Sequence, residues 1–139
     1  MRTGIDLVQY AVELPNGDII LATRVSTTFH GSTSALAIFR LNHKGETIWD
    51  KLIGTDDTDA LGSMALSSDG YIGIIGRGPY DPTSDTGIHY IKLDDSGTVL
   101  QNKVFYFDNV ATSAMQIAAT PDAGFVINGR GNIAGNFKQ

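Results

Sequence analysis

The sequence predicts an all-β protein built from repeated four-stranded antiparallel sheets that do not add up to a closed ring. Three observations predict this fold. A segment recurs at a fixed spacing, turn residues separate short apolar runs, and these runs lack the 3.6-residue period of an amphipathic helix. Internal repetition at a period of about 50 residues is typical of propellers, solenoids and repeat arrays.

The repeat is clearest in a stretch that occurs three times, each copy beginning 53 residues after the one before. The copies are LPNGDIILATR (14–24), SSDGYIGIIGR (67–77) and TPDAGFVINGR (120–130). A second stretch occurs twice, 52 residues apart, as LAIFRLNHKGETIWDKLI (36–53) and IHYIKLDDSGTVLQNKVF (88–105). The spacings differ by one residue while the apolar cores align, so we expect loops of different length between equivalent strands.

Each complete unit is expected to contain four strands. In the first unit they are predicted near residues 7–14, 18–24, 35–41 and 47–53. The whole chain, 1–139, is then one domain with two complete units and the first two strands of a third. These units span about 7–54, about 60–106 and about 113–131.

Glycine-containing turns are expected to join the strands within each unit. The first two strands meet at Asn16-Gly17 and, one unit later, at Asp69-Gly70, where Gly supplies the positive φ that a tight hairpin needs. The third and fourth strands meet at turns that end in Gly45 and Gly97.

Burial is predicted from the aligned columns of the second strand. Ile19, Ile72 and Phe125 share one column, and the column two residues later also holds large apolar residues, so this face is expected to be the core. The opposite face, which begins with Ile20 in the first unit, is smaller and mixed but still mostly apolar. Strands covered on both faces are typical of sheets packed face to face.

These segments resemble a bacterial β-propeller repeat. The units DGYIGIIG, HYIKLDDSG and TVLQNKVF are similar to a pattern written DGGYIxxG and xxxxKLDxxGxxxWxK, related in style to Kelch-like and pyrroloquinoline-quinone-type blades. Trp49 holds the Trp position in the first unit and Gln101 replaces it in the second. The resemblance implies propeller blades and leaves activity open, because such repeats serve binding proteins, lectins and enzymes alike. It also suggests an exported bacterial protein.

Composition narrows the classes of partner. The net charge is −5 and the ten Lys and Arg residues are scattered, which argues against nucleic-acid binding. There is no cysteine, no apolar run long enough to span a bilayer and no signal-peptide pattern, so a soluble protein without membrane contact is expected. No motif for a cofactor is found.

An open stack of two and a half blades leaves an apolar face and a strand edge to be covered. Three covers are possible: self-assembly of identical chains, the remainder of a larger propeller, or an arc that curls into a different sandwich. Self-assembly into a homo-oligomer is the favoured interpretation.

Arginine recurs at one position of the repeat, as Arg24, Arg77 and Arg130. A repeated guanidinium can bind carboxylated or phosphorylated ligands through its planar fork. The alternative is structural, in which each arginine caps its own hairpin or pairs with a neighbouring aspartate. Phe29 and Tyr80, placed in long loops, are the best aromatic candidates for stacking on a glycan.

Metal sites have little support. Asp56, Asp57 and Asp59 offer the carboxylates that Ca²⁺ prefers, but their loop lacks the glycine and distant Glu of an EF-hand. The histidines lack zinc-ligand spacing, and His89 is predicted to be a packed or rim residue rather than a catalyst.

No catalytic constellation can be assembled from the spacing of residues. The sequence therefore predicts a non-enzymatic binding or scaffold module whose ligand is a carbohydrate or another small polar molecule. The alternative is a piece of a propeller hydrolase or lyase whose carboxylates meet only on assembly.

Overall fold

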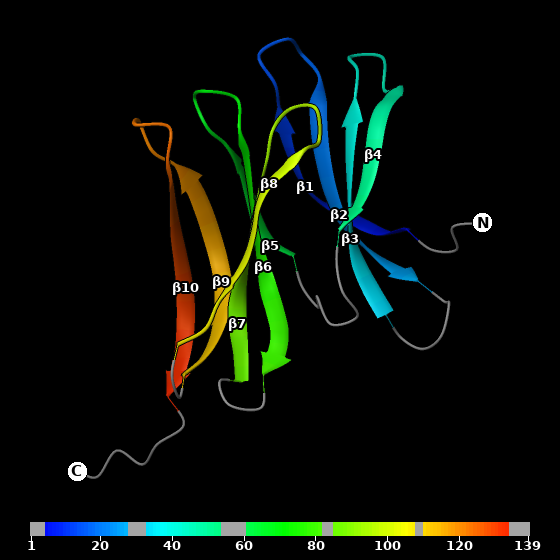
Figure 1. The fold of residues 1–139 in the computed structure, drawn as a ribbon. Coiled ribbons are helices and arrows are strands. Elements are labelled where there is room, and N and C mark those ends of the chain that lie inside the picture. The colour runs from blue at the N-terminus through cyan, green and yellow to red at the C-terminus, as the bar shows by residue number, and fades with distance from the viewer. Residues whose placement is uncertain (1–4, 28–32, 54–60, 82–84, 108–109, 134–139) are drawn as a thin grey trace.

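The computed structural model describes residues 5–27, 33–53, 61–81, 85–107 and 110–133, and these residues form ten β-strands and no helix (Figure 1). The fold is therefore all-β, as predicted, and the described part of the chain holds no helix that spans a membrane. The strands are β1 (Ile5–Glu13), β2 (Ile19–Thr27), β3 (Thr33–Leu41), β4 (Thr47–Ile53), β5 (Leu61–Leu66), β6 (Ile72–Asp81), β7 (Asp85–Leu93), β8 (Val99–Phe105), β9 (Val110–Ala119) and β10 (Phe125–Ile133).

The strands form three antiparallel sheets in chain order. Sheet 1 has the strand order β1-β2-β3-β4 and sheet 2 the order β5-β6-β7-β8, while sheet 3 contains only β9 and β10. The sheets stand side by side like blades and do not close into a ring or barrel (Figure 1). The predicted fold class, four-stranded antiparallel blades in an incomplete stack, is confirmed.

Five tight turns in the described residues share one geometry and lie at the same end of the molecule, the upper end in Figure 1. In each, the fourth residue donates its N–H to the carbonyl of the first, as Gly17 does to Leu14 at 2.9 Å. That fourth residue has positive φ, which Gly adopts freely, but in the third β1–β2-type turn it is Ala123, at φ 64°. A left-handed alanine costs roughly 1–2 kcal/mol, so this turn is the strained copy.

Breaks in the register of strand pairing also recur at equivalent positions of the repeat. The first strand of every sheet has a break in register at the same place, around Gln9, Gly62 and Met115. The fourth strands break at Ile48 and Leu100, which are also equivalent. Bulges increase the local twist of a strand, so each unit bends in the same way.

Each sheet has two faces, and we call first the one directed toward the preceding sheet and second the one directed toward the following sheet. The main core lies between the second face of sheet 1 and the first face of sheet 2. Its most deeply buried side chains are Ile20, Ile38, Ile72, Ile74 and Leu93. Burying an aliphatic side chain of this size stabilises the fold by roughly 1.5–3 kcal/mol.

The predicted core face is only partly buried in sheet 1. Ile19 and Leu21 are only half-buried, whereas Ile20 and Ala22 on the other face are completely buried. The reason is positional, because no described sheet packs over the part of this face around Ile19 and Leu21, although Thr23, Val25 and Ala37 farther along it are buried. In sheet 2 both faces are covered, so Ile72 and Ile75 are both buried, as predicted.

Sheet 3 covers only part of sheet 2. Strand β9 lies across β5, β6 and β7, and Ile75, Tyr90 and Ile117 form the small core between the two sheets. Tyr90 is buried in this core, whereas Phe105, on the outer strand β8, is 44% exposed. Its counterpart Ile53 is buried by sheet 2, whereas β9 and β10 do not reach over β8.

Candidate functional site

Sheet 1 binds a turn of sheet 2 through three side chains that we call the latch: Arg40, Trp49 and Lys51. Arg40 Nη1 donates to the carbonyl of Asp95 at 2.7 Å, and Trp49 Nε1 donates to the same carbonyl at 3.0 Å. Lys51 Nζ donates to the carbonyl of Gly97. The β7–β8 turn is therefore fixed against β3 and β4 mainly through main-chain acceptors.

Arg40 also connects this latch to the first turn of the chain. Its Nε and Nη2 atoms lie 3.0 and 2.7 Å from Asp18 Oδ2, and Asn16 Nδ2 donates to the same oxygen at 3.0 Å. The hydrogen bonds from Arg40 lower the pKa of Asp18 below its ordinary value of 3.8, while partial desolvation opposes this shift. One guanidinium thus holds two turns from different sheets.

An open groove of about 400 Å³ lies between these turns at the upper end of the molecule. This volume falls in the roughly 300–1,000 Å³ range of small-molecule pockets. The groove is mixed in character, with an apolar wall from Leu14 and Pro15 and polar groups from the neighbouring turns. The residues that contribute polar side chains are Asn16, Arg40, Ser68, Asp69 and Asp95.

The carboxylates of the turns are held by short-range hydrogen bonds. Asp69 accepts from the hydroxyl of Ser67, and Asp95 Oδ2 lies 3.4 Å from Arg40 Nη1 with most of its side chain exposed. In the same turn as Asp95, the Ser96 side chain and the backbone N–H groups of Thr98 and Ser96 hold the pKa of Asp94 below 3.8. The groove itself presents the carboxylate oxygens of Asp69 and Asp95 beside the amide of Asn16, an arrangement that can hydrogen-bond hydroxyl groups.

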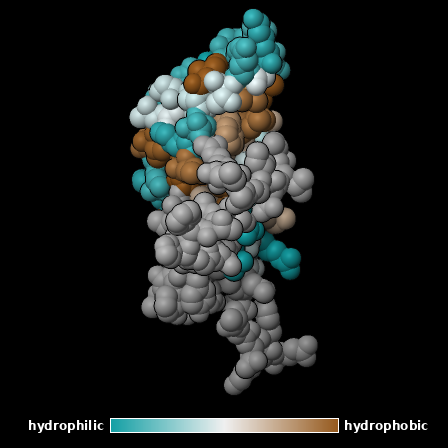
Figure 2. Space-filling view, turned by 90° about the vertical axis from the view of Figure 1, so that its right-hand side faces the viewer, coloured by the Kyte–Doolittle hydropathy of each residue, from teal (hydrophilic) through white to brown (hydrophobic). Residues whose placement is uncertain are grey.

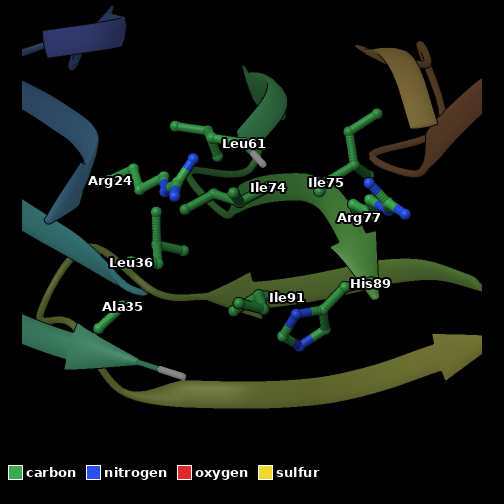
Figure 3. Close-up of a pocket in the computed structure, with 10 residues that line it drawn as sticks. Arg24, Ala35, Leu36, Leu61, Ile74, Ile75, Arg77, His89 and Ile91 are labelled. Atoms are coloured by element: carbon green, nitrogen blue, oxygen red, sulfur yellow. The ribbon is translucent and has the colours of Figure 1, made fainter. Parts of the chain in front are cut away.

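A second, much smaller void lies between sheets 1 and 2 beyond the main core, lined by Arg24, Leu36, Leu61 and His89 among others (Figure 3). Its volume is about 20 Å³, room for roughly one water molecule. His89 is buried, and its Nε2 lies 2.6 Å from Asn102 Oδ1, so the prediction that it is a packed histidine is confirmed.

The structure brings two of the three recurrent arginines, Arg24 and Arg77, to the lining of this small void, but not Arg130 (Figure 3). The three residues come from successive sheets, with Arg24 in sheet 1, Arg77 in sheet 2 and Arg130 in sheet 3. All three are exposed, and none makes an ion pair or side-chain hydrogen bond with another described residue. Their proposed role as anion ligands stays a prediction.

Several other candidates lie outside the described residues, namely Phe29, His30, Asp56, Asp57 and Asp59. Tyr80 was expected in a loop, but β6 continues through Asp81 and Tyr80 pairs with Thr86 in the backbone ladder. That strand is longer than predicted because its partner β7 begins at Asp85 and extends the hairpin. Among the described residues no three His, Asp or Glu side chains gather as a metal site.

The turn groove was missed at the sequence level. Asn16 and Asp69 occur in the three-copy stretch, but their position in tight turns accounts for them as turn formers. Nothing in the sequence shows that turns 53 residues apart face a common groove. No protein-family model and no curated protein matches this chain, so resemblance adds no residue to the site.

Proposed function

We propose that this chain is a non-enzymatic binding module of β-propeller type that holds a small polar ligand, with a carbohydrate as the ligand class, in the turn groove. The observation that carries the proposal is the groove itself, about 400 Å³ between turns held by the latch. A fixed groove avoids the ordering cost that a mobile site has to meet on binding.

The side chains of the groove fit a neutral polyol better than an anion. Asp69 and Asp95 supply acceptors for hydroxyl groups, and Asn16 supplies both a donor and an acceptor. Leu14 and Pro15 offer an apolar wall for the carbon face of a sugar ring. The one cation, Arg40, is already engaged by two aspartates, so it positions the groove rather than attracting a charged ligand.

The proposal is tested by titrating the chain with a panel of neutral mono- and oligosaccharides, followed by calorimetry and by NMR shifts of the turn residues. For a sugar that binds, Asp69→Ala is expected to weaken affinity at least about tenfold, since a hydrogen bond to a charged group contributes roughly 1.5–3 kcal/mol. Asp122→Ala is the matched control, because Asp122 occupies the same position in the third sheet, away from the groove. Equal weakening by both variants, or no binding sugar, contradicts the proposal.

A hydrolase is the second candidate, favoured by the presence of two carboxylates, Asp69 and Asp95, on one groove. Glycoside hydrolysis commonly uses such a pair. A glycosidase substrate panel separates the two proposals. Turnover that Asp69→Asn abolishes replaces the binding module with an enzyme, and binding without turnover supports the module.

We also propose that the first face of sheet 1 is covered by a second copy of the chain. Ile48 and Leu52 on this face are 51% and 52% exposed, and apolar surface is visible on this side of the molecule (Figure 2). The equivalent face of sheet 2, which includes Ile72 and Ile74, is buried against sheet 1. The first face of this repeat therefore already packs against another sheet within the chain. Light scattering should give a multiple of 14.9 kDa, and Leu52→Asp should reduce it to the monomer mass. A wild-type monomer contradicts this proposal.

A further inference from the structure

We propose that the open edge of β10, together with the neighbouring face of β8, is an acceptor site for a β-hairpin that carries the third- and fourth-strand pattern of this same repeat. Within the described residues β10 pairs only with β9. The equivalent strands β2 and β6 are interior strands, each paired on the far side with β3 or β7 along most of its length. An extended segment adds to a strand edge through main-chain hydrogen bonds.

The latch provides an independent observation that points to the same hairpin. Lys92, Gln101 and Lys103 occupy the positions in sheet 2 that Arg40, Trp49 and Lys51 occupy in sheet 1. Lys92 pairs with Gln101 across the ladder as Arg40 pairs with Trp49, so the geometry is repeated. In sheet 1 these positions bind the carbonyls of a hairpin turn in the next sheet. Gln101 and Lys103 are exposed, and no hydrogen bond or ion pair to the rest of the described chain involves either side chain.

The apolar surface around this second latch completes the site. Phe105 is 44% exposed on the face that β9 and β10 leave open, whereas its counterpart Ile53 is 8% exposed beneath sheet 2. Lys92 Nζ lies 4.3 Å above the centroid of the Tyr71 ring and marks the upper limit of the same face. The occupant is therefore a hairpin with alternating apolar residues for Phe105 and a turn whose carbonyls face Gln101 and Lys103.

The hairpin formed by residues 85–105 of the chain is the probe that fits this description, because it contains β7, the Asp94–Gly97 turn and β8. A fluorescent synthetic copy is titrated into the full chain and followed by anisotropy. Saturable binding is expected, and a shuffled peptide of the same composition should not bind. The double variant Gln101→Ala with Lys103→Ala should weaken affinity at least about tenfold. The matched control, His43→Ala with Lys44→Ala in the exposed β3–β4 turn, should leave it unchanged.

Hydrogen exchange locates the bound hairpin. Amides of Phe125–Ile133 should gain protection on binding, while those of the outer strands β4 and β8 should not. A bound peptide that protects β4 or β8 instead, or whose affinity is unchanged by the double variant, overturns the proposal. So does the absence of binding.

A covalent fusion of the hairpin to the chain tests the same proposal even if the free peptide does not fold. Fusing a second copy of residues 85–105 after Gln139 should raise the thermal unfolding midpoint by about 5 °C or more, since 1 kcal/mol shifts the midpoint of a domain this size by a few degrees. A fusion with the shuffled segment should not. Equal midpoints for the two fusions overturn the proposal.

Discussion

The two interfaces between successive sheets are built differently from equivalent positions. Between sheets 1 and 2 the second-strand column holds Ile20, which is completely buried among other large aliphatic residues. Between sheets 2 and 3 the same column holds Gly73, where an added Cβ would lie 2.8 Å from Ile117 Cδ1 and 3.0 Å from Phe125 Cε1. In the first interface side chains of both strands fill this column, whereas in the second the side chains of Ile117 and Phe125 pack directly on the backbone of β6.

Equivalent polar residues near the turns of sheets 1 and 2 also make different contacts. In sheet 1, Asp18 and Arg40 form an ion pair at 2.7 Å, and the equivalent residues of sheet 2, Tyr71 and Lys92, form a cation–π contact. Trp49 packs on Gly97 in the first latch, whereas Gln101 has no such partner among the described residues. One backbone repeat therefore supports two packing solutions, because side-chain volume and charge can change while the strand ladder stays the same.

The largest expected effect comes from emptying the first interface. Ile38→Ala should lower the free energy of unfolding by about 3 kcal/mol, because a completely buried isoleucine leaves a cavity among close-packed neighbours. Urea denaturation measures the change. Val126→Ala, at a 56% exposed position of sheet 3, is the control and should stay within about 0.5 kcal/mol of wild type. Equal effects would mean that the first interface is not the main source of stability.

The next largest loss of stability should come from giving the interface between sheets 2 and 3 the side chain found between sheets 1 and 2. Gly73→Ile introduces the residue found at position 20 and should cost about 2 kcal/mol, since Ile117 and Phe125 leave no room for it. Hydrogen exchange should show faster exchange in β9 and β10 than in sheet 1. Ala118→Ile, at an exposed position of β9, should be close to neutral. A stable Gly73→Ile variant would show that the sheets can separate without loss.

Exchanging the latch residues should have a smaller effect. Trp49→Gln gives sheet 1 the side chain of sheet 2 and should cost about 1.5 kcal/mol, through the lost hydrogen bond to Asp95 and lost packing on Gly97. The reverse change, Gln101→Trp, should leave the free energy of unfolding unchanged, because no described turn lies opposite it. Chemical denaturation of both variants gives the comparison. A neutral Trp49→Gln would show that the latch adds no stability.

The smallest expected effect is a pH dependence of the free energy of unfolding that comes from the Asp18–Arg40 ion pair. The equivalent Tyr71–Lys92 contact contains no carboxylate. Hydrogen bonding to Arg40 lowers the pKa of Asp18 below 3.8, so near this pH the unfolded chain binds more protons than the folded one. The stabilisation is present above about pH 4 and is lost as pH falls through the lowered pKa. Asp18→Asn should lose less stability between pH 4 and 2 in denaturation experiments. An acid limb identical to that of wild type would contradict this role.

Much of the fold is predictable from local pattern. Gly17, Gly45, Gly70 and Gly97 mark turns because each holds a positive φ, and the spacing of these turns places the strands within a few residues. The candidate site is harder to predict. Asp69 and Asp95 are turn residues in the sequence, and only the packing of sheet 2 on sheet 1 gives them a shared groove with Asn16. The exposure of Phe105 has the same origin, because the sequence of β8 does not show how far the next sheet extends over it.

The sequence by itself determined the strands, their turns and the antiparallel order within each sheet, because these depend on alternation, on φ and on neighbours along the chain. Tertiary structure decided which face of each sheet is buried, where Arg40 makes its contacts and which turns form a groove. Burial is a property of what lies opposite a residue. Ile19 and Ile72 occupy the same position of the repeat, and only Ile72 has a sheet packed against it.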